Sequence, residues 1–142
     1  MFFKLVRPSE PVQLPLRATS NSAGYDFFAP EDYIIAPHRS MKISTNVTVF
    51  LDDTDASRWV LLLYPRSSTA IKHGLALVNT VCVIDSDYCG FEIGVFVENR
   101  SDEPLVIKAG DRFCQGVFMP YLTISNDAAD GERSGGFGST GR

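Results

Sequence analysis

The segment from Asn79 to Gly90 holds the residues best suited to acid–base chemistry. It reads NTVCVIDSDYCG, so Asp85 follows an apolar strand and Tyr88 comes three residues later. A carboxylate in such a semi-buried setting can act as a general base. The same residues also suit an ordinary hairpin turn, Asp-Ser-Asp, with Tyr88 packed over it. Taken alone, this segment leaves catalysis and turn formation both open.

A second group of residues could bind an anion. Residues 65–68, PRSS, stand where an apolar run ends and a short helical pattern begins, so a guanidinium, two hydroxyls and helix-start amides meet. This group is either a phosphate cradle or a helix N-cap beside a surface arginine. Two further segments are ordinary turn chemistry by themselves. They are residues 23–26, AGYD, which end on Asp26, and residues 109–116, AGDRFCQG, which carry Gln115.

The C-terminal segment is built differently from the rest of the chain. Five of the eleven glycines lie after residue 130, and Phe137 is the only large apolar residue beyond Asn126. Such a segment cannot fold by burying itself. It is either a frayed terminus, which composition favours, or an arm that orders over a ligand, with glycines allowing close backbone approach to phosphates.

Strands must position these segments, because strand patterning dominates the chain. Alternating apolar residues predict half-buried strands over 43–49 and 91–98, and continuous apolar runs at 59–64 and 75–78 predict strands buried on both faces. Turn residues separate the runs at short intervals. The only helix expected is Ser67–His73, capped by a serine. We therefore expect an all-β sandwich, jelly roll or small barrel.

Length and composition limit the class of protein. The chain has 142 residues, of which 44% are hydrophobic, enough for one domain with a real core. The net charge of −4 argues against a nucleic-acid partner. No apolar run approaches the ~20 residues of a membrane span, and the N-terminus has no signal-peptide core. We expect a soluble, cytoplasmic protein with no membrane partner.

Cysteine and histidine usage gives little support for a protein-bound metal. Cys82, Cys89 and Cys114 are an odd number at spacings of seven and twenty-five, which match neither a disulfide framework nor a zinc pattern. The only histidines are His38 and His73. We expect reduced thiols and a metal, if any, that arrives with a substrate.

Five motifs, taken in order, resemble those of the homotrimeric dUTP diphosphatase (dUTPase) family. They are AGYD from residue 23, PRS from 65, N-x4-I-D-x-D-Y-x-G from 79, GDR-x-x-Q from 110 and R-x-GGFGSTG from 133. The resemblance covers nearly the whole chain. It implies an all-β, jelly-roll-like barrel with one short helix and a flexible glycine-rich arm, assembled as a homotrimer. We expect residues 1–125 to form the barrel and 126–142 to form the arm.

The resemblance implies hydrolysis of dUTP to dUMP and pyrophosphate, which limits uracil incorporation into DNA and supplies dUMP for dTMP synthesis. Asp85 would be the general base for the water that attacks the α-phosphorus. Tyr88 would stack on the deoxyribose and exclude a 2′-OH. The hairpin that binds uracil would comprise Asn79, Val83, Ile84 and Gly94, together with the backbone of Asp85.

The resemblance also assigns the phosphate side of the site. Charge stabilisation would come from Arg66, Ser67, Ser68 and Gln115. Mg2+ would bind the triphosphate, with Asp26 hydrogen-bonding a magnesium-bound water. Phe137 would lie over the uracil. The arm residues that would close over the phosphates as a lid are Arg133, Gly138, Ser139 and Thr140.

In this family each site is shared by three subunits, and the arm of one covers a site formed by the other two. The chain departs from the usual motifs at four places. Ser68 and Cys82 stand at common glycine positions, and Cys89 replaces a common arginine. Ten residues separate Tyr88 from Asn99 where nine are expected, which predicts a bulge around 91–92. These departures concern the hairpin and the phosphate loop, and none removes a catalytic group.

Two other functions stay open. One is dCTP deaminase, a relative with the same fold and an R-S-S motif, as at residues 66–68 here. The deaminases carry a catalytic glutamate where this chain has Phe96, and they lack a tyrosine at the position of Tyr88. The other is a non-catalytic binding protein on the same scaffold, against which Asp85 and the arm argue.

Overall fold

Short strands account for most of the regular secondary structure in the computed structural model, which describes residues 1–10, 12–51 and 58–136. The strands are β1 (Phe2–Leu5), β2 (Tyr25–Phe28), β3 (Tyr33–Ile35), β4 (Ser40–Ser44), β5 (Val47–Phe50), β6 (Trp59–Pro65), β7 (Leu75–Leu77), β8 (Cys82–Asp85), β9 (Gly94–Asn99), β10 (Leu105–Ile107) and β11 (Arg112–Pro120). The helix α1 spans Ser67–His73, and a 3₁₀ helix, η1, spans Ser86–Tyr88. The all-β prediction with one short α-helix agrees with this description.

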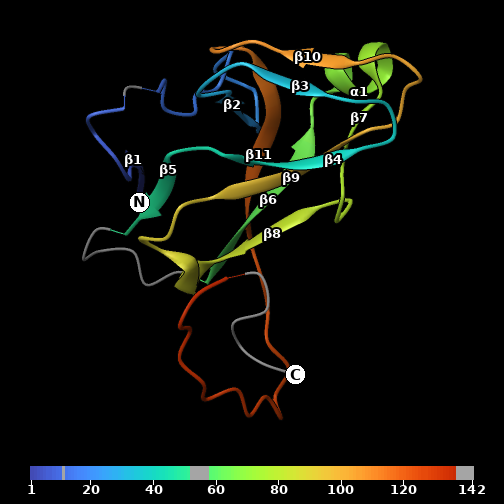
Figure 1. Ribbon diagram of the computed structural model, residues 1–142. Coiled ribbons are helices and arrows are strands. Elements are labelled where there is room, and N and C mark those ends of the chain that lie inside the picture. The colour runs from blue at the N-terminus through green and yellow to red at the C-terminus, as the bar shows by residue number, and fades with distance from the viewer. Residues whose placement is uncertain (11, 52–57, 137–142) are drawn as a thin grey trace.

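The strands form antiparallel sheets around one core (Figure 1). A four-stranded sheet has the order β2-β11-β6-β8, and a three-stranded sheet has the order β4-β9-β7. Two smaller pairs, β1-β5 and β10-β3, complete the described part of the barrel. Figure 1 shows α1 near β10, while the segment after β11 loops below the barrel and returns toward η1.

Apolar side chains from the two larger sheets meet in the core. Phe27 and Leu61 of the four-stranded sheet are fully buried, as is Val97 of the three-stranded sheet. Burying a side chain of this size contributes roughly 1.5–3 kcal/mol. Gly116 of β11 faces the same core, and a Cβ there would lie 2.7 Å from Leu63. The core therefore packs directly against the β11 backbone, which a larger residue would displace.

The predicted strand over 43–49 is two strands. β4 ends at Ser44 and β5 begins at Val47, because Asn46 adopts the left-handed conformation with φ 58°. β4 then belongs to the three-stranded sheet, whereas β5 pairs with β1. The alternation of apolar residues continues through the corner, so the pattern alone did not reveal the break.

The predicted strand over 91–98 begins later than expected. β9 starts at Gly94, and residues 89–93 form a turn after η1, with Gly90 at φ 83°. Residues 91–92 therefore lie before β9 and not within a strand, so the predicted β-bulge does not form there. Among the described ladders, a register shift lies instead in β11, between Arg112 and Cys114.

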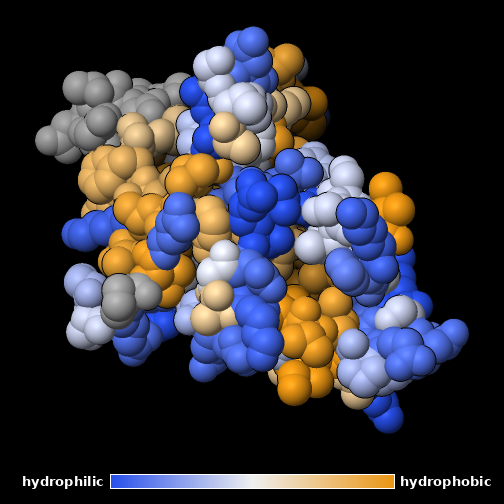
Figure 2. Space-filling model, turned by 90° about the horizontal axis from the view of Figure 1, so that it is seen from above, coloured by the Kyte–Doolittle hydropathy of each residue, from blue (hydrophilic) through white to orange (hydrophobic). Residues whose placement is uncertain are grey.

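The runs at 59–64 and 75–78 are not buried on both faces of this chain. In β6, Leu61 and Leu63 are buried while Leu62 is only partly covered, and in β7 Ala76 is likewise partly covered. The outer sides of these strands are apolar surface. The view from above in Figure 2 also shows hydrophobic residues among hydrophilic ones. One chain alone leaves apolar surface uncovered.

The helix α1 has the predicted bounds but not the predicted cap. Its N-cap is Arg66 in an extended conformation, and no side chain caps the N-terminus. The C-cap is Gly74 at φ 68°, whose N–H donates to the carbonyl of Ala70. Lys72 and His73 in the last turn suit the negative end of the helix dipole.

Candidate functional site

The predicted phosphate-side residues meet in one cavity of about 610 Å³ at the end of the four-stranded sheet. Strand register brings them together, because Gln115 of β11 pairs with Asp26 of β2 on one side and with Tyr64 of β6 on the other. β6 then ends at Pro65 and α1 begins. The cavity is lined by Ala18, Ser22, Ala23, Gly24, Asp26, Tyr64, Arg66, Ser67, Ser68, Gln115 and Val117.

A buried ion-pair cluster organises this cavity. Asp26 is 6% exposed, and its Oδ1 lies 2.8 Å from Arg66 Nε while its Oδ2 accepts from Arg112 Nη1 at 3.2 Å. A buried carboxylate is tolerated only when it is paired in this way. Asp26 therefore fixes the direction of the Arg66 guanidinium at the cavity wall.

Arg112 and Gly24 are site residues that the sequence-based assignment omitted. Arg112 pairs with Asp26, and a Cβ on Gly24 would lie 2.7 Å from Gln115 Oε1. Both lie inside motifs of the family, Gly24 in AGYD and Arg112 in GDR-x-x-Q. Their membership of these motifs is the sequence feature that could have identified them. Their roles depend on contacts between strands distant in sequence.

The predicted nucleoside-side residues meet in a second, smaller cavity of about 120 Å³. It lies where β8 and η1 face the start of β9 and the returning C-terminal segment. Its lining residues are Asn79, Cys82, Val83, Ile84, Asp85, Tyr88, Gly94, Arg133 and Gly136. The cavity thus brings together all the residues that the sequence assigned to the nucleoside, among those that the structure describes.

Asp85, the predicted base, is half-exposed and paired with the arm. Its Oδ2 lies 2.5 Å from Arg133 Nη2, and Arg133 Nε lies 2.6 Å from Asp87 Oδ1. The Asp85 side chain is 52% exposed. The hydrogen bond to Asp87 is the main cause that raises the pKa of Arg133, so this guanidinium stays charged. The arm therefore places a permanent cation on the predicted catalytic carboxylate of its own chain.

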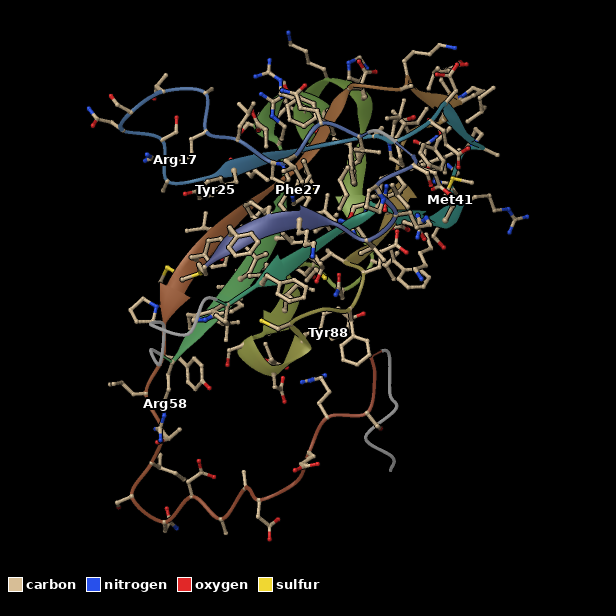
Figure 3. The ribbon with its side chains drawn as sticks, turned by 90° about the vertical axis from the view of Figure 1, so that its left-hand side faces the viewer. Arg17, Tyr25, Phe27, Met41, Arg58 and Tyr88 are labelled. Carbon is tan, nitrogen blue, oxygen red and sulfur yellow. The ribbon has the colours of Figure 1, made fainter. Side chains whose placement is uncertain are left out.

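Tyr88 is held at both ends. Its backbone closes η1, and its hydroxyl donates to the carbonyl oxygen of Glu92 at 3.0 Å. Its ring lies 5.3 Å from the ring of Phe91, centroid to centroid. Burial raises the pKa of Tyr88, so the phenol stays a neutral donor. Figure 3 shows Tyr88 on the side where the C-terminal segment returns.

The arm makes close contact with Tyr88. A Cβ on Gly136 would lie 2.7 Å from Tyr88 Cε2, so only glycine fits there without movement. The guanidinium of Arg133 lies 5.8 Å from the centroid of the same ring. The other arm residues assigned by sequence, Phe137, Gly138, Ser139 and Thr140, lie outside the described residues.

Cys82, which stands at a common glycine position, is accommodated beside the nucleoside cavity. It is buried, and burial raises the pKa of its thiol while a side-chain hydrogen bond with Asn79 lowers it. Cys82, Cys89 and Cys114 are all free thiols, as expected from their spacing. The neutral thiol therefore adds bulk to the hairpin without adding charge.

The two cavities lie at opposite ends of β6. Asp85 pairs with Val60 at the start of this strand, whereas Arg66 follows its end at Pro65. Arg66 lies six positions beyond Val60, which is roughly 20 Å along an extended strand. One chain therefore presents the predicted base and the predicted phosphate cradle on the same sheet but does not bring them together.

The structure holds no cluster of metal-ligating side chains within residues 1–10, 12–51 and 58–136: no three His, Cys, Asp or Glu residues there could hold an ion. In the same residues, no helix combines the length and apolarity needed to cross a membrane.

The fold and the two cavities define the class: an all-β, jelly-roll-like protein with one cavity around Asp85 and Tyr88 and a second cavity lined by Arg66. The sequence matches the dUTPase family over residues 10–141. The chain therefore belongs to the dUTPase family, and the identification made from the five motifs is confirmed.

Individual relatives agree with this assignment. The deoxyuridine 5′-triphosphate nucleotidohydrolase of Lactococcus lactis is 42% identical over 92% of this chain and 89% of its own. The crystal structure of dUTPase from Streptococcus mutans superposes with a TM-score of 0.75 at 34% identity, covering 87% of this chain and 98% of that one. The jelly-roll prediction is thereby confirmed.

A more distant relative shows the fold alone. A mutant form of the dUTPase from phage phi11 of S. aureus, described with a structural Mg(II) ion, is 22% identical with a TM-score of 0.74. The superposition covers 94% of this chain and 98% of that one.

Proposed function

We propose that this protein hydrolyses dUTP to dUMP and pyrophosphate, with Asp85 as the general base for water attack on the α-phosphorus. The observation that supports this most directly is the nucleoside cavity, which unites Asp85, Tyr88 and the hairpin residues of the third motif. Such an activity would limit uracil incorporation into DNA and supply dUMP for dTMP synthesis.

The nucleoside cavity suits a deoxyribonucleotide. Asn79, Val83, Ile84 and Gly94 line a cavity of about 120 Å³, and the Asn79 amide and the backbone groups of the hairpin would hydrogen-bond the base. Tyr88 would pack on the sugar, where an extra 2′-OH would meet the ring. Asp85 is half-exposed, so it can reach a water at the α-phosphorus.

The phosphate cavity suits the triphosphate. Arg66, the hydroxyls of Ser67 and Ser68, and the amide of Gln115 would stabilise negative charge as it shifts during phosphoryl transfer. The first amides of α1 have no partners inside the helix and can also meet phosphate oxygens. Asp26 and Arg112 would keep Arg66 aimed at these oxygens.

The arm would act as a lid. Arg133 donates hydrogen bonds to the carboxylates of Asp85 and Asp87. When substrate binds, this guanidinium would exchange these carboxylate oxygens for phosphate oxygens. Gly138, Ser139 and Thr140 would contact the phosphates, and Phe137 would cover the uracil. Closure of this kind excludes water other than the nucleophile.

Magnesium fits the phosphate cavity as an ion carried by the substrate. Bound to the triphosphate, Mg2+ would neutralise phosphate charge. An ionised carboxylate accepts about four hydrogen bonds, and the arginine contacts leave Asp26 with capacity for a metal-bound water. Asp26 would therefore orient the hydrated ion without binding it directly.

A homotrimer would bring the two half-sites together. On the outer face of the four-stranded sheet, an apolar row of Val117, Leu62 and Val83 lies across neighbouring strands between the two cavities. A nucleotide spanning both cavities of one chain would lay charged phosphates across this row, which is unfavourable. Packing the row against another copy would bury it and place one chain's Arg66 near the next chain's Asp85.

The proposal is tested by incubating the protein with dUTP, dCTP or UTP in the presence of Mg2+ and measuring pyrophosphate and deaminated product. We expect pyrophosphate from dUTP, far less from UTP, and no deamination of dCTP. Deamination of dCTP without pyrophosphate release from dUTP would contradict the proposal. Light scattering of the same preparation should give three times the 15.7 kDa of one chain.

A further inference from the structure

Tyr88 is connected to the N-terminal segment through Glu92, and neither Glu92 nor its partner Arg7 lies at an assigned site position. The Tyr88 hydroxyl donates to the Glu92 carbonyl oxygen at 3.0 Å. The Glu92 side chain then pairs with Arg7, eighty-five residues away in the sequence. The position of the ring thus depends on a residue distant from the cavity.

The contact between Arg7 and Glu92 is bidentate. Arg7 Nη1 lies 2.9 Å from Glu92 Oε2, and Nη2 lies 3.1 Å from Oε1. The backbone N–H of Asn46 also donates to Oε1 at 2.7 Å. Paired hydrogen bonds from a planar guanidinium fix both the position and the plane of a carboxylate. Glu92 is therefore held at three points.

Arg7 is itself held in place by a buried side chain. Asn46 is 1% exposed, accepts from the Arg7 N–H at 2.7 Å and donates to the Arg7 carbonyl at 3.0 Å. The left-handed backbone of Asn46, at φ 58°, turns its side chain toward the N-terminal segment. Arg7 thus reaches Glu92 from a fixed backbone.

We propose that Arg7 and Glu92 are positioning residues that hold the Tyr88 ring rigid and thereby set the preference for deoxyribose over ribose. A ring excludes a 2′-OH only if it cannot move aside. Its backbone end is fixed by η1, and its hydroxyl end is fixed by the main-chain carbonyl of Glu92. Arg7 holds the side-chain carboxylate of the same residue and thereby restrains its backbone. The inference rests on the proposed function, in which Tyr88 packs on the sugar.

The first experiment compares kcat/KM for dUTP and UTP in Arg7→Ala and in the unmodified protein. We expect the ratio of the two to fall about fivefold, as the loss of one hydrogen bond of about 1 kcal/mol predicts. In Arg7→Lys the ratio should fall by a smaller factor, because an ammonium group keeps the charge but cannot form the paired contact with Glu92. Glu10→Gln is the control: it removes the exposed partner of Arg7 Nε and should leave the ratio unchanged.

A second experiment separates positioning from general stability. Tyr88→Phe removes the hydroxyl that reaches Glu92 and should lower the same ratio by a similar factor. If Arg7 acts through this hydroxyl, adding Arg7→Ala to Tyr88→Phe should change the ratio no further. If the double variant instead lowers the ratio by the product of the two single-variant factors, Arg7 acts separately from the Tyr88 hydroxyl and the inference is overturned.

The outcomes distinguish this inference from the proposed function. If the unmodified protein does not hydrolyse dUTP, the proposed function fails. If it prefers dUTP and Arg7→Ala keeps that preference, only the positioning role fails. If Arg7→Ala does not fold, Arg7→Lys and Tyr88→Phe decide: unchanged ratios in both overturn the role, and lowered ratios support it.

Discussion

The two cavities are constructed in different ways, although they lie on the same sheet. The phosphate cavity is formed by paired strands and organised by the buried carboxylate of Asp26 between two arginines. The nucleoside cavity is formed by a 3₁₀ turn and a returning segment, and its carboxylate, Asp85, is half-exposed. The comparison indicates that strand pairing forms the cavity around Asp26, whereas the cavity around Asp85 is completed by a short turn and by the C-terminal segment.

The largest expected effect is on the nucleoside side. Asp85→Asn should lower kcat for dUTP by about 10²–10⁴-fold, because it removes the proposed general base. Binding of a non-hydrolysable dUTP analogue should persist, since the phosphate cavity is unchanged, and calorimetry can measure it. Retained turnover would contradict the assigned role.

The next effect is a loss of folding stability that we expect only when the buried carboxylate of the phosphate cavity is changed. Asp26→Asn leaves Arg66 and Arg112 beside a neutral amide in a largely buried place, and we expect a loss of about 2 kcal/mol in the free energy of unfolding. Urea denaturation measures it. The control Asp102→Asn removes an exposed pair with His38 and should leave stability unchanged. Equal losses of unfolding free energy in the two variants would show that the buried cluster around Asp26 contributes no more to stability than an exposed ion pair.

A smaller effect concerns the contact between the arm and Tyr88. Gly136→Ala would place a methyl 2.7 Å from Tyr88 Cε2, so the arm should close less well and kcat/KM should fall about tenfold. Gly131→Ala is the control, because a Cβ there meets nothing within 4 Å. Steady-state kinetics measure both variants. A fall of the same size in the control would attribute the effect to arm flexibility and not to the contact.

The smallest effect depends on pH. Arg7 is the main cause that lowers the pKa of Glu92 below its ordinary 4.5, so this pair stabilises the protein above about pH 4.5 and the gain is lost as pH falls through the lowered pKa. Glu92→Gln should cost about 0.5–1 kcal/mol at pH 7, since both side chains are partly exposed, and this cost should shrink as the pH falls through the lowered pKa of Glu92. Chemical unfolding at several pH values checks this. A constant difference would contradict the assignment.

The sequence predicted the elements better than their boundaries. Helix α1 and the strand character of β6 follow from local patterning. The corner at Asn46 and the turn before Gly94 do not, because the apolar alternation continues through both. The prediction that β6 is buried on both faces was also wrong for a single chain. An apolar run predicts that a face is covered but does not reveal whether the same chain or another copy covers it.

Motif order by itself determined the family, because each motif keeps its chemical residues together within a few positions. It also determined which residues gather on the nucleoside side, where most come from one continuous segment. The tertiary structure decided the rest. Contacts such as Asp26 with Arg112, or Arg7 with Glu92, join residues more than eighty positions apart. Only strand pairing and the folded turn bring such residues within hydrogen-bond distance, because local sequence preference acts over a few residues at most.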